Sequence, residues 1–313
     1  MNTKLDLPVW LLSILSEEAR KISPQKGVLN LVELTEASEF YNRQFNPRKE
    51  KTVQSSLSAY DEQQVQCSEA GTPRYMKEML QVIEAFADEN CIVVELGGGQ
   101  HQARSGCAFK RFHKYVPLDI SAENMLAYSQ KYKLPSIACD ATKLPFKDSS
   151  IDIIFTHTFL EHPTRPDRVV EEIIRVLRPG GWVFHADAWN CRWWQRYGFH
   201  AQDFRLERNE ILLHLRYLMY RFYETTPLYQ LHLLMRRAWF LFLQETLRPK
   251  HLLFTPLTPN YGLSLYSDED AAASLDPIVV GNFYRKRGFT ASHSVLKKMW
   301  DMPRFISAQK RMN

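Results

Sequence analysis

Three acidic residues at regular places in the chain offer its clearest chemistry. Glu95, Asp119 and Asp140 each stand at the end of a short apolar run, and Glu95 leads into three consecutive glycines at 97–99. Short apolar runs are typical of strands buried on both faces, and the carboxyl ends of parallel strands line one edge of a sheet. Glycines after such a strand leave the main chain bare, so that a ligand can lie against it. We therefore expect the three carboxylates to converge on one ligand site.

The spacing of these residues indicates a ligand built like a nucleoside. Asp119 lies 20 positions after Gly99, where a carboxylate can accept hydrogen bonds from both hydroxyls of a ribose. Asp140 is placed to meet the exocyclic amine of a base. A nicotinamide or flavin dinucleotide is the rival ligand, but its G-x-G-x-x-G pattern fails at Gln102, and Glu95 would repel a pyrophosphate.

The elements that must position these residues alternate along the chain. Apolar runs predict strands over 91–96, 115–118, 136–139, 151–155 and 182–185, and helical spacing predicts helices over 75–86, 123–132 and 169–177. Strict alternation of strand and helix predicts an α/β fold with a doubly wound, mostly parallel, Rossmann-like sheet that carries helices on both faces.

The pattern divides the chain into four segments. Residues 1–70 form an N-terminal helical extension with an apolar helix near its start, and residues 71–190 form the ligand-binding core. Residues 191–262 form a helical insert or lid, with helices expected over 211–222 and 227–248 and Thr226 capping the second. Residues 263–313 complete the core sheet with a strand that begins near Gly288.

Composition narrows the class of protein. The chain has 313 residues, 45% of them hydrophobic and 24% charged, which is ordinary for a globular protein and excludes a wholly disordered chain. A net charge of +5 does not mark a dedicated nucleic-acid binder. The five cysteines form no C-x-x-C pair, so we expect no zinc site, no other metal site and no disulfide framework. No signal peptide is evident, which favours the cytoplasm.

Five segments in this order resemble the motifs of class I S-adenosylmethionine-dependent methyltransferases. They are Glu-Leu-Gly-Gly-Gly at 95–99, Asp119, Cys-Asp-Ala-Thr-Lys-Leu-Pro-Phe at 139–146, Phe-Leu-Glu-His at 159–162 and Arg-Val-Leu-Arg-Pro-Gly-Gly at 175–181. The subgroup that they resemble most is that of ubiquinone and menaquinone biosynthesis methyltransferases, over residues 75–190. The resemblance implies the class I methyltransferase fold and S-adenosylmethionine as the cofactor.

The resemblance also implies roles for single residues. Gly97 and Gly99 would cradle the methionine part of the cofactor, Asp119 would hold its ribose, and Asp140 with Ala141 would meet its adenine. The full set expected at the cofactor is Glu95, Gly97, Gly98, Gly99, His101, Asp119, Ile120, Asp140, Ala141 and Thr156. His101 stands where the family usually has a third glycine, so we expect a differently shaped turn in which His101 faces the cofactor or the substrate.

Methyl transfer depends on placing a nucleophile in line with the methyl group, and it needs a general base only when the acceptor is protonated. Candidate bases are His157, His162 and His185, with Asp187 beside them in sequence. His157 directly follows a predicted strand and is the first choice. Burial within a strand is the alternative for His185, and helping to start a helix is the alternative for His162.

The sequence therefore predicts an S-adenosylmethionine-dependent methyltransferase that acts on a small or lipid-like acceptor, which can be an oxygen, nitrogen or carbon nucleophile. The alternatives are a cofactor-binding partner protein without transfer activity and, less favoured because nucleic acid is not the expected partner, an RNA methyltransferase. Residues 192–251 contain ten Arg and Lys and five Asp and Glu among many large apolar side chains. This composition suits peripheral membrane contact through 205–250 and equally a helical hairpin packed on the domain. The sequence favours no oligomeric state.

Overall fold

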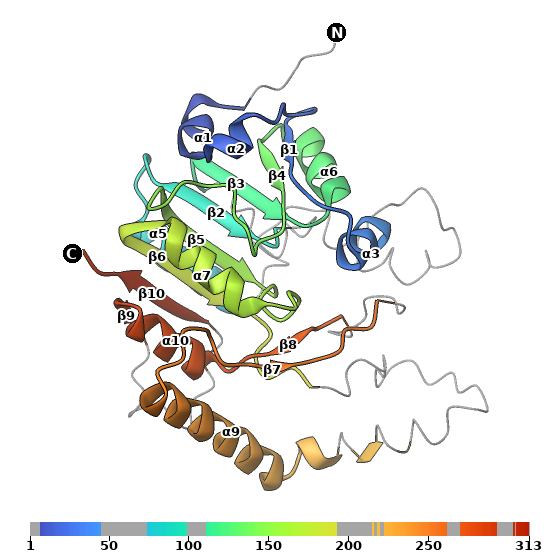
Figure 1. The fold of residues 1–313 in the computed structure, drawn as a ribbon, viewed down its shortest axis with the longest axis vertical. Coiled ribbons are helices and arrows are strands. Elements are labelled where there is room, and N and C mark those ends of the chain that lie inside the picture. The colour runs from blue at the N-terminus through green and yellow to red at the C-terminus, as the bar shows by residue number, and fades with distance from the viewer. Residues whose placement is uncertain are drawn as a thin grey trace.

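An eight-stranded sheet in the order β1-β4-β3-β2-β5-β6-β10-β9 forms the centre of the protein (Figure 1). The computed structural model describes residues 7–44, 74–98, 111–192, 215, 218–219, 222–261, 270–292, 303 and 305–312. The strands of the sheet are β1 Val28–Asn30, β2 Ile92–Leu96, β3 Lys114–Asp119, β4 Ser136–Ala138, β5 Ile151–His157, β6 Leu177–Ala186, β9 Phe289–Ala291 and β10 Ile306–Lys310. Neighbours from β1 to β6 pair in parallel, and β10 runs antiparallel to β6 and β9. The predicted doubly wound, mostly parallel sheet is confirmed.

Helices cover both faces of this sheet. They are α1 Val9–Ile14, α2 Glu17–Arg20, α3 Glu36–Gln44, α5 Arg74–Phe86, α6 Ala122–Tyr132, α7 Pro166–Val176, α9 Pro227–Thr246 and α10 Pro277–Lys286, and a short pair of strands, β7 Thr255–Pro256 and β8 Ala273–Ser274, lies apart from the sheet. Successive side chains of β5 alternate between two buried apolar clusters. Ile154 belongs to the cluster shared with α1, α7 and α10, whereas Ile153 and Phe155 belong to the cluster shared with α5 and α6.

The strand order reverses between β2 and β5, which places a ligand crevice at their carboxyl ends. β2 leads through β3 to β4 on one side, and β5 leads to β6 on the other. Leu96 of β2 pairs in register with Leu118 of β3 and with Thr156 of β5. The next residues on these strands, including Asp119 and His157, therefore lie at one level along the edge of the sheet.

The N-terminal extension differs from the prediction. The expected apolar helix is present as α1, but Val28–Asn30 forms β1, which pairs in parallel with β4 and adds a strand to the edge of the sheet. Leu29 is fully buried in the core. A three-residue strand is too short to show a periodic pattern, so nothing in the sequence separates it from a loop.

The C-terminal part also contains a strand that the sequence did not reveal. The predicted terminal strand near Gly288 is β9, and β10 follows it and inserts between β9 and β6. The predicted strand at 182–185 is the second half of β6, which begins directly after α7. Gly180 in this strand has a positive φ of 81°, which marks the bend at the predicted Arg-Pro-Gly-Gly segment.

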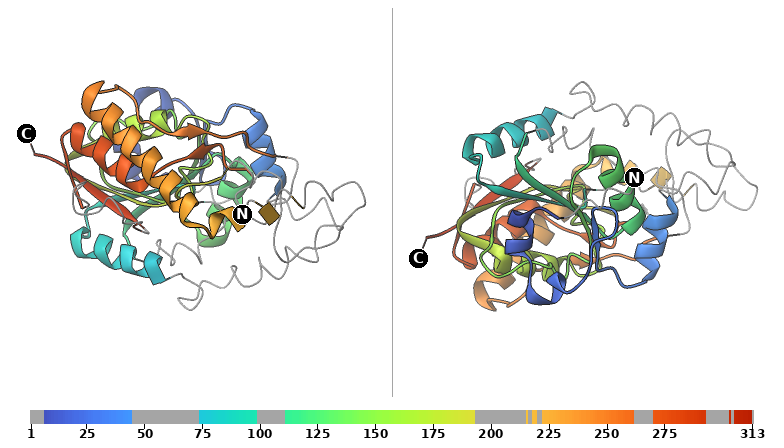
Figure 2. Two further views of the ribbon diagram at one scale, coloured as in Figure 1. Left: turned by 90° about the horizontal axis from the view of Figure 1, so that it is seen from below. Right: turned by 90° about the horizontal axis from the view of Figure 1, so that it is seen from above.

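The second helix of the predicted insert is α9, which packs against α10 (Figure 2). The Arg237 guanidinium is buried and its Nε lies 2.9 and 3.1 Å from the two oxygens of Asp276, the residue that caps the N-terminus of α10. Thr226 precedes α9 as expected, but its hydroxyl donates to the Tyr223 carbonyl, so the predicted side-chain cap is wrong. Of the helix predicted over 211–222, residues 215, 218–219 and 222 are helical, and the rest lies outside the described residues.

No helix among the described residues is long and apolar enough to cross a bilayer.

Replacing Leu29 with Ala tests whether β1 is part of the folded core. Because Leu29 is fully buried, we expect Leu29→Ala to lower the free energy of unfolding by about 2–4 kcal/mol in urea titrations followed by circular dichroism. Leu34→Ala is the matched control, since Leu34 is 82% exposed and its loss should change stability by less than about 0.5 kcal/mol. Equal stability of the two variants would contradict a structural role for β1.

Candidate active site

The chain turns sharply where β2 ends. Gly97 has a φ of 74°, and a Cβ built on it would lie 2.4 Å from the Phe159 ring, so only glycine fits. The N–H groups of Gly97 and Gly98 donate to the Leu118 carbonyl at 2.9 and 3.0 Å, which brings the bare turn over the end of β3. The predicted ligands Gly99 and His101 lie outside the described residues.

Two of the predicted carboxylates stand beside this turn. Asp119 is half-buried at the end of β3, and Asp140 is exposed two residues after β4. Each accepts a hydrogen bond of 2.8 Å through Oδ1 from the backbone N–H two residues later, which fixes its orientation. The residues that follow them, Ile120 and Ala141, are half-buried. Neighbouring carboxylates with solvent access and a bare glycine turn suit a ligand that presents hydroxyls and an amine, as S-adenosylmethionine does.

Glu95 occupies a different environment from the other two acids. Its carboxylate is buried and accepts a hydrogen bond from the Tyr115 hydroxyl. Burial and then the charge of Glu95 raise the pKa of the nearby Tyr128 phenol. The Glu95 carboxyl carbon would lie 3.6 Å from a Cβ on Gly98, so this side chain borders the turn from within the packed face of the sheet.

A buried hydrogen-bonded chain crosses the neighbouring strand ends. Thr156 of β5 donates through Oγ1 to Asp187 Oδ2 at 2.8 Å, and the same Oγ1 lies 2.8 Å from His185 Nδ1. Because the single Thr156 proton goes to the carboxylate, His185 donates from Nδ1 and accepts at Nε2 from the Tyr284 hydroxyl, 2.9 Å away. Burial, with a smaller effect of the Asp187 charge, raises the pKa of Tyr284. His185 is fully buried with both nitrogens engaged, so it positions Asp187 and lies out of reach of a substrate.

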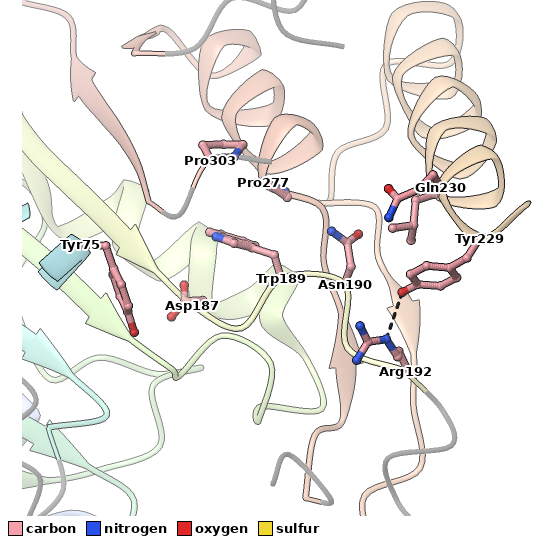
Figure 3. A pocket seen from close by; sticks show the side chains of 10 residues that line it. Tyr75, Asp187, Trp189, Asn190, Arg192, Tyr229, Gln230, Pro277 and Pro303 are labelled. Atoms are coloured by element: carbon pink, nitrogen blue, oxygen red, sulfur yellow. Dashed lines mark hydrogen bonds between the residues drawn. The ribbon is translucent and has the colours of Figure 1, made fainter. Parts of the chain in front are cut away.

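Asp187 faces a cavity of about 460 Å³. Tyr75, Asp187, Trp189, Asn190, Arg192, Tyr229, Gln230, Leu233, Pro277 and Pro303 line the cavity, which lies between the strand ends and the N-terminal half of α9 (Figure 3). The Tyr75 hydroxyl is 3.0 Å from Nε2 of the buried His157, the first-choice base. Sequence reasoning missed Tyr75, Trp189 and Tyr229, because they are far apart in the chain and stand in no motif.

His162 belongs to a second polar cluster. Its Nδ1 lies 3.0 Å from Oδ2 of the buried Asp270, which also accepts a 2.5 Å hydrogen bond from the Tyr41 hydroxyl. Burial acts to raise the pKa of Asp270, but His162 and the hydrogen bonds outweigh burial and lower it. The His162 side chain is 20% exposed, so it can reach a ligand. The expectation that His162 helps to start a helix is wrong, because α7 begins at Pro166.

Comparison with known proteins identifies the core of this site. Residues 94–185, which include the last three residues of β2, all of β3, β4 and β5 and most of β6, match the family model described as a methyltransferase domain. This segment is a methyltransferase domain. The resemblance to class I S-adenosylmethionine-dependent methyltransferases drawn from the sequence is confirmed for it, and S-adenosylmethionine is the cofactor of that class.

Two curated relatives each match less than a third of the chain. A demethylmenaquinone methyltransferase of Streptomyces avermitilis is 38% identical over 94 residues, which is 29% of this chain and 39% of that protein. A probable phthiotriol/phenolphthiotriol dimycocerosates methyltransferase of Mycobacterium ulcerans is 33% identical over 84 residues, which is 25% of this chain and 31% of that protein. The chain thus spans less than half the length of these relatives. A solved S-adenosylmethionine-dependent methyltransferase of Methanosarcina mazei superposes with a TM-score of 0.40 at 16% identity, covering 74% of this chain and 98% of its own.

Asp119→Ala tests the cofactor side of the methyltransferase domain. If its carboxylate holds the ribose hydroxyls, calorimetry should show S-adenosylmethionine binding weakened by about 10- to 100-fold, the value of a charge-assisted hydrogen bond. Asp148→Asn is the control, because Asp148 is 77% exposed and its carboxylate pairs with Arg175. Unchanged affinity in Asp119→Ala would show that the ribose is held elsewhere.

Acid unfolding tests the Asp270 cluster. Because folding lowers the pKa of Asp270 below its ordinary value of 3.8, this group adds stability above that pH, and the contribution is lost as the pH falls through the folded-state pKa. The difference in free energy of unfolding between wild type and Asp270→Asn should therefore be large near neutral pH and should shrink in strong acid. Tyr41→Phe removes one of the hydrogen bonds that lower the pKa and should give a smaller effect of the same sign. A difference that does not vary with pH would contradict this assignment.

Proposed function

We propose that the chain is an S-adenosylmethionine-dependent methyltransferase that methylates a small or lipid-like acceptor in the cavity lined by Tyr75 and Trp189. The observation that supports this proposal is the position of the cavity. It lies just beyond the carboxyl end of β6, where Asp187 lines it, and β6 pairs with β5, which in turn pairs with β2, the strand that leads into Gly97. An acceptor there and a cofactor at the carboxyl edge of the sheet would meet at the strand ends.

Different residues at this edge of the sheet contact different parts of the cofactor. When bound, S-adenosylmethionine supplies an electrophilic methyl group on a sulfonium sulfur. Asp119 accepts hydrogen bonds from the ribose hydroxyls, and Asp140 with Ala141 borders the adenine. The backbone of Gly97 and Gly98 borders the methionine part, and the neighbouring Glu95 carboxylate favours a positive charge there.

The walls of the cavity favour an acceptor with an extended apolar or aromatic part. Trp189, Leu233 and Tyr229 supply apolar and aromatic surface, as is typical of small-molecule sites. Arg192 lies at one side, held at 3.1 Å from Glu224 and 3.2 Å from the Tyr229 hydroxyl. The names of the two curated relatives, one acting on demethylmenaquinone and one on phthiotriol or phenolphthiotriol dimycocerosates, agree with such an acceptor.

Tyr75 and His157 are the groups best placed to take a proton from a hydroxyl or amine acceptor. Tyr75 lines the cavity and its hydroxyl is 3.0 Å from His157 Nε2, so a proton lost by the acceptor can pass through Tyr75 to the imidazole. His162, oriented by Asp270, is the second candidate. A carbon acceptor that is already nucleophilic would need neither.

Transfer of a labelled methyl group tests the proposed activity. Purified protein is incubated with methyl-labelled S-adenosylmethionine and either quinols, phenolic lipids, short-chain phenols or RNA, and the label is followed into each product. We expect label in a lipid-like or phenolic fraction. Binding of S-adenosylmethionine without transfer to any fraction would favour a cofactor-binding partner protein, and label in RNA with salt-sensitive RNA affinity would favour an RNA methyltransferase.

Substitutions at the Tyr75–His157 pair test the proton path once an acceptor is known. We expect His157→Asn to lower kcat by about 100-fold or more and Tyr75→Phe to lower it less, with S-adenosylmethionine affinity unchanged in both. His113→Asn is the control, because His113 is exposed and lies at the amino end of β3, away from the site. Unchanged kcat in His157→Asn together with a large loss in His162→Asn would transfer the role to His162.

A further inference from the structure

α9 buries Tyr229, Leu233 and Leu241 against the protein, but it also carries large apolar side chains on the side that faces away from the protein. Leu228, Leu231, Met235, Trp239 and Phe242 follow one another at intervals of three or four residues, and all are exposed, Met235 by 64% and Trp239 by 57%. This spacing places them on one face of the helix, and we call them the outer stripe. Among the described elements, α9 lies at one edge of the molecule, with α10 and the β7–β8 pair on one side of it (Figure 1).

The two arginines of α9 face the opposite way, and its one acid, Glu245, pairs with Lys286 at the C-terminal end of the helix. Arg236 and Arg237 are the only Lys, Arg, Asp or Glu residues between Pro227 and Gln244. Arg237 is 1% exposed and pairs with Asp276, and Arg236 donates to Ser274 Oγ at 2.9 Å. A helix on a water-facing surface has the reverse arrangement, with its apolar side inward and its charges outward.

We propose that the outer stripe lies on an anionic lipid surface, with α9 parallel to the plane of the membrane. The first support is the charge at the C-terminal end of α9. Arg248 and Lys250 follow the helix, and Arg285, Lys286 and Arg287 stand at the end of the adjoining α10. Lys286 pairs with Glu245, and Arg287 lies 3.7 Å from Glu171. The five cations outnumber these two acids, and a net positive charge next to an apolar face complements anionic headgroups.

The side chains of the outer stripe are the second support. Trp239 and Phe242 stack with ring centroids 5.8 Å apart and are both more than half exposed. Amphipathic helices that lie in a membrane interface use Trp, Phe and Leu on their buried face.

α9 also borders the cavity, so the same helix carries the outer stripe and part of the proposed acceptor site. Tyr229 and Leu233 of α9 line the cavity, while Leu228 and Leu231 face outward one turn away. A lipid acceptor could therefore pass from the membrane around the N-terminal half of α9 to the Asp187 side of the cavity. This last step rests on the proposed function, whereas membrane docking by the outer stripe does not.

Vesicle flotation of the full chain tests the docking. We expect the protein to float with vesicles of phosphatidylcholine and phosphatidylglycerol, and to float less with phosphatidylcholine alone or at high salt. The double variant Trp239→Ser/Phe242→Ser should lower the bound fraction by about tenfold or more. Val9→Ser/Leu34→Ser is the matched control, because these residues are 83% and 82% exposed elsewhere on the protein, and it should bind as wild type does.

Two further measurements make the result decisive. Sedimentation equilibrium shows whether the outer stripe instead covers a second copy of the chain: a wild-type dimer that the double variant converts to a monomer would overturn the proposal. Failure of the full chain to enter the vesicle fraction, or an equal loss of binding in the control variant, would also overturn the proposal.

Calorimetry with S-adenosylmethionine is run on the same samples. If the protein floats with vesicles but does not bind S-adenosylmethionine, the proposed function alone is rejected. If it binds S-adenosylmethionine but does not float, the docking alone is rejected.

Discussion

The register of β2 against its two neighbours is the constraint on which the rest of the site depends. Leu96 pairs in register with Leu118 on one side and Thr156 on the other, so the glycine turn, Asp119 and His157 begin at the same level along the carboxyl edge of the sheet. A slip of one residue would turn every side chain of a strand to the opposite face and move Asp119 into an apolar layer. Burial of both faces of the sheet prevents such a slip, because the two apolar clusters accept only one alternation.

Buried polar groups next to this edge are tolerated because each is tied to another element. Asp187 receives the Thr156 hydroxyl and the backbone N–H groups of Phe159 and Leu160, which offset the cost of removing its charge from water. His185 and Tyr284 continue the chain into α10, so the C-terminal part of the protein helps to set the position of a cavity-lining carboxylate.

α9 is also held by a buried polar pair, and it borders both the cavity and the outer surface of the protein. Its buried Arg237 guanidinium pairs with Asp276 at the start of α10, and Leu241 packs against Ile278 and Val279 of that helix, so polar and apolar contacts fix α9 together. Tyr229 and Leu233 face the cavity, and Trp239 and Phe242 face outward. One rigid element can thus connect an outer apolar surface to the wall of the cavity.

Local signals in the sequence determined most of the central sheet. The apolar runs of β2 and β5, the spacing of Asp119 from the glycines and the helical periodicity of α7 each depend on neighbours within a few positions, which is why the methyltransferase fold and its cofactor could be predicted. The order of the motifs also gave the correct class of domain over residues 94–185.

Tertiary structure alone decided how distant residues meet. β1 and β10 are short segments whose hydrogen bonds go to strands far away in the chain, so no local period marks them. Tyr75 and His157, which are in contact, are 82 positions apart in the sequence, and His162 and Asp270 are 108 positions apart. The sequence offered three histidines as candidate bases, with His157 as the first choice. Packing buried His185, joined His157 to the cavity through Tyr75 and oriented His162 with a carboxylate, because burial and hydrogen-bond partners are properties of the folded chain.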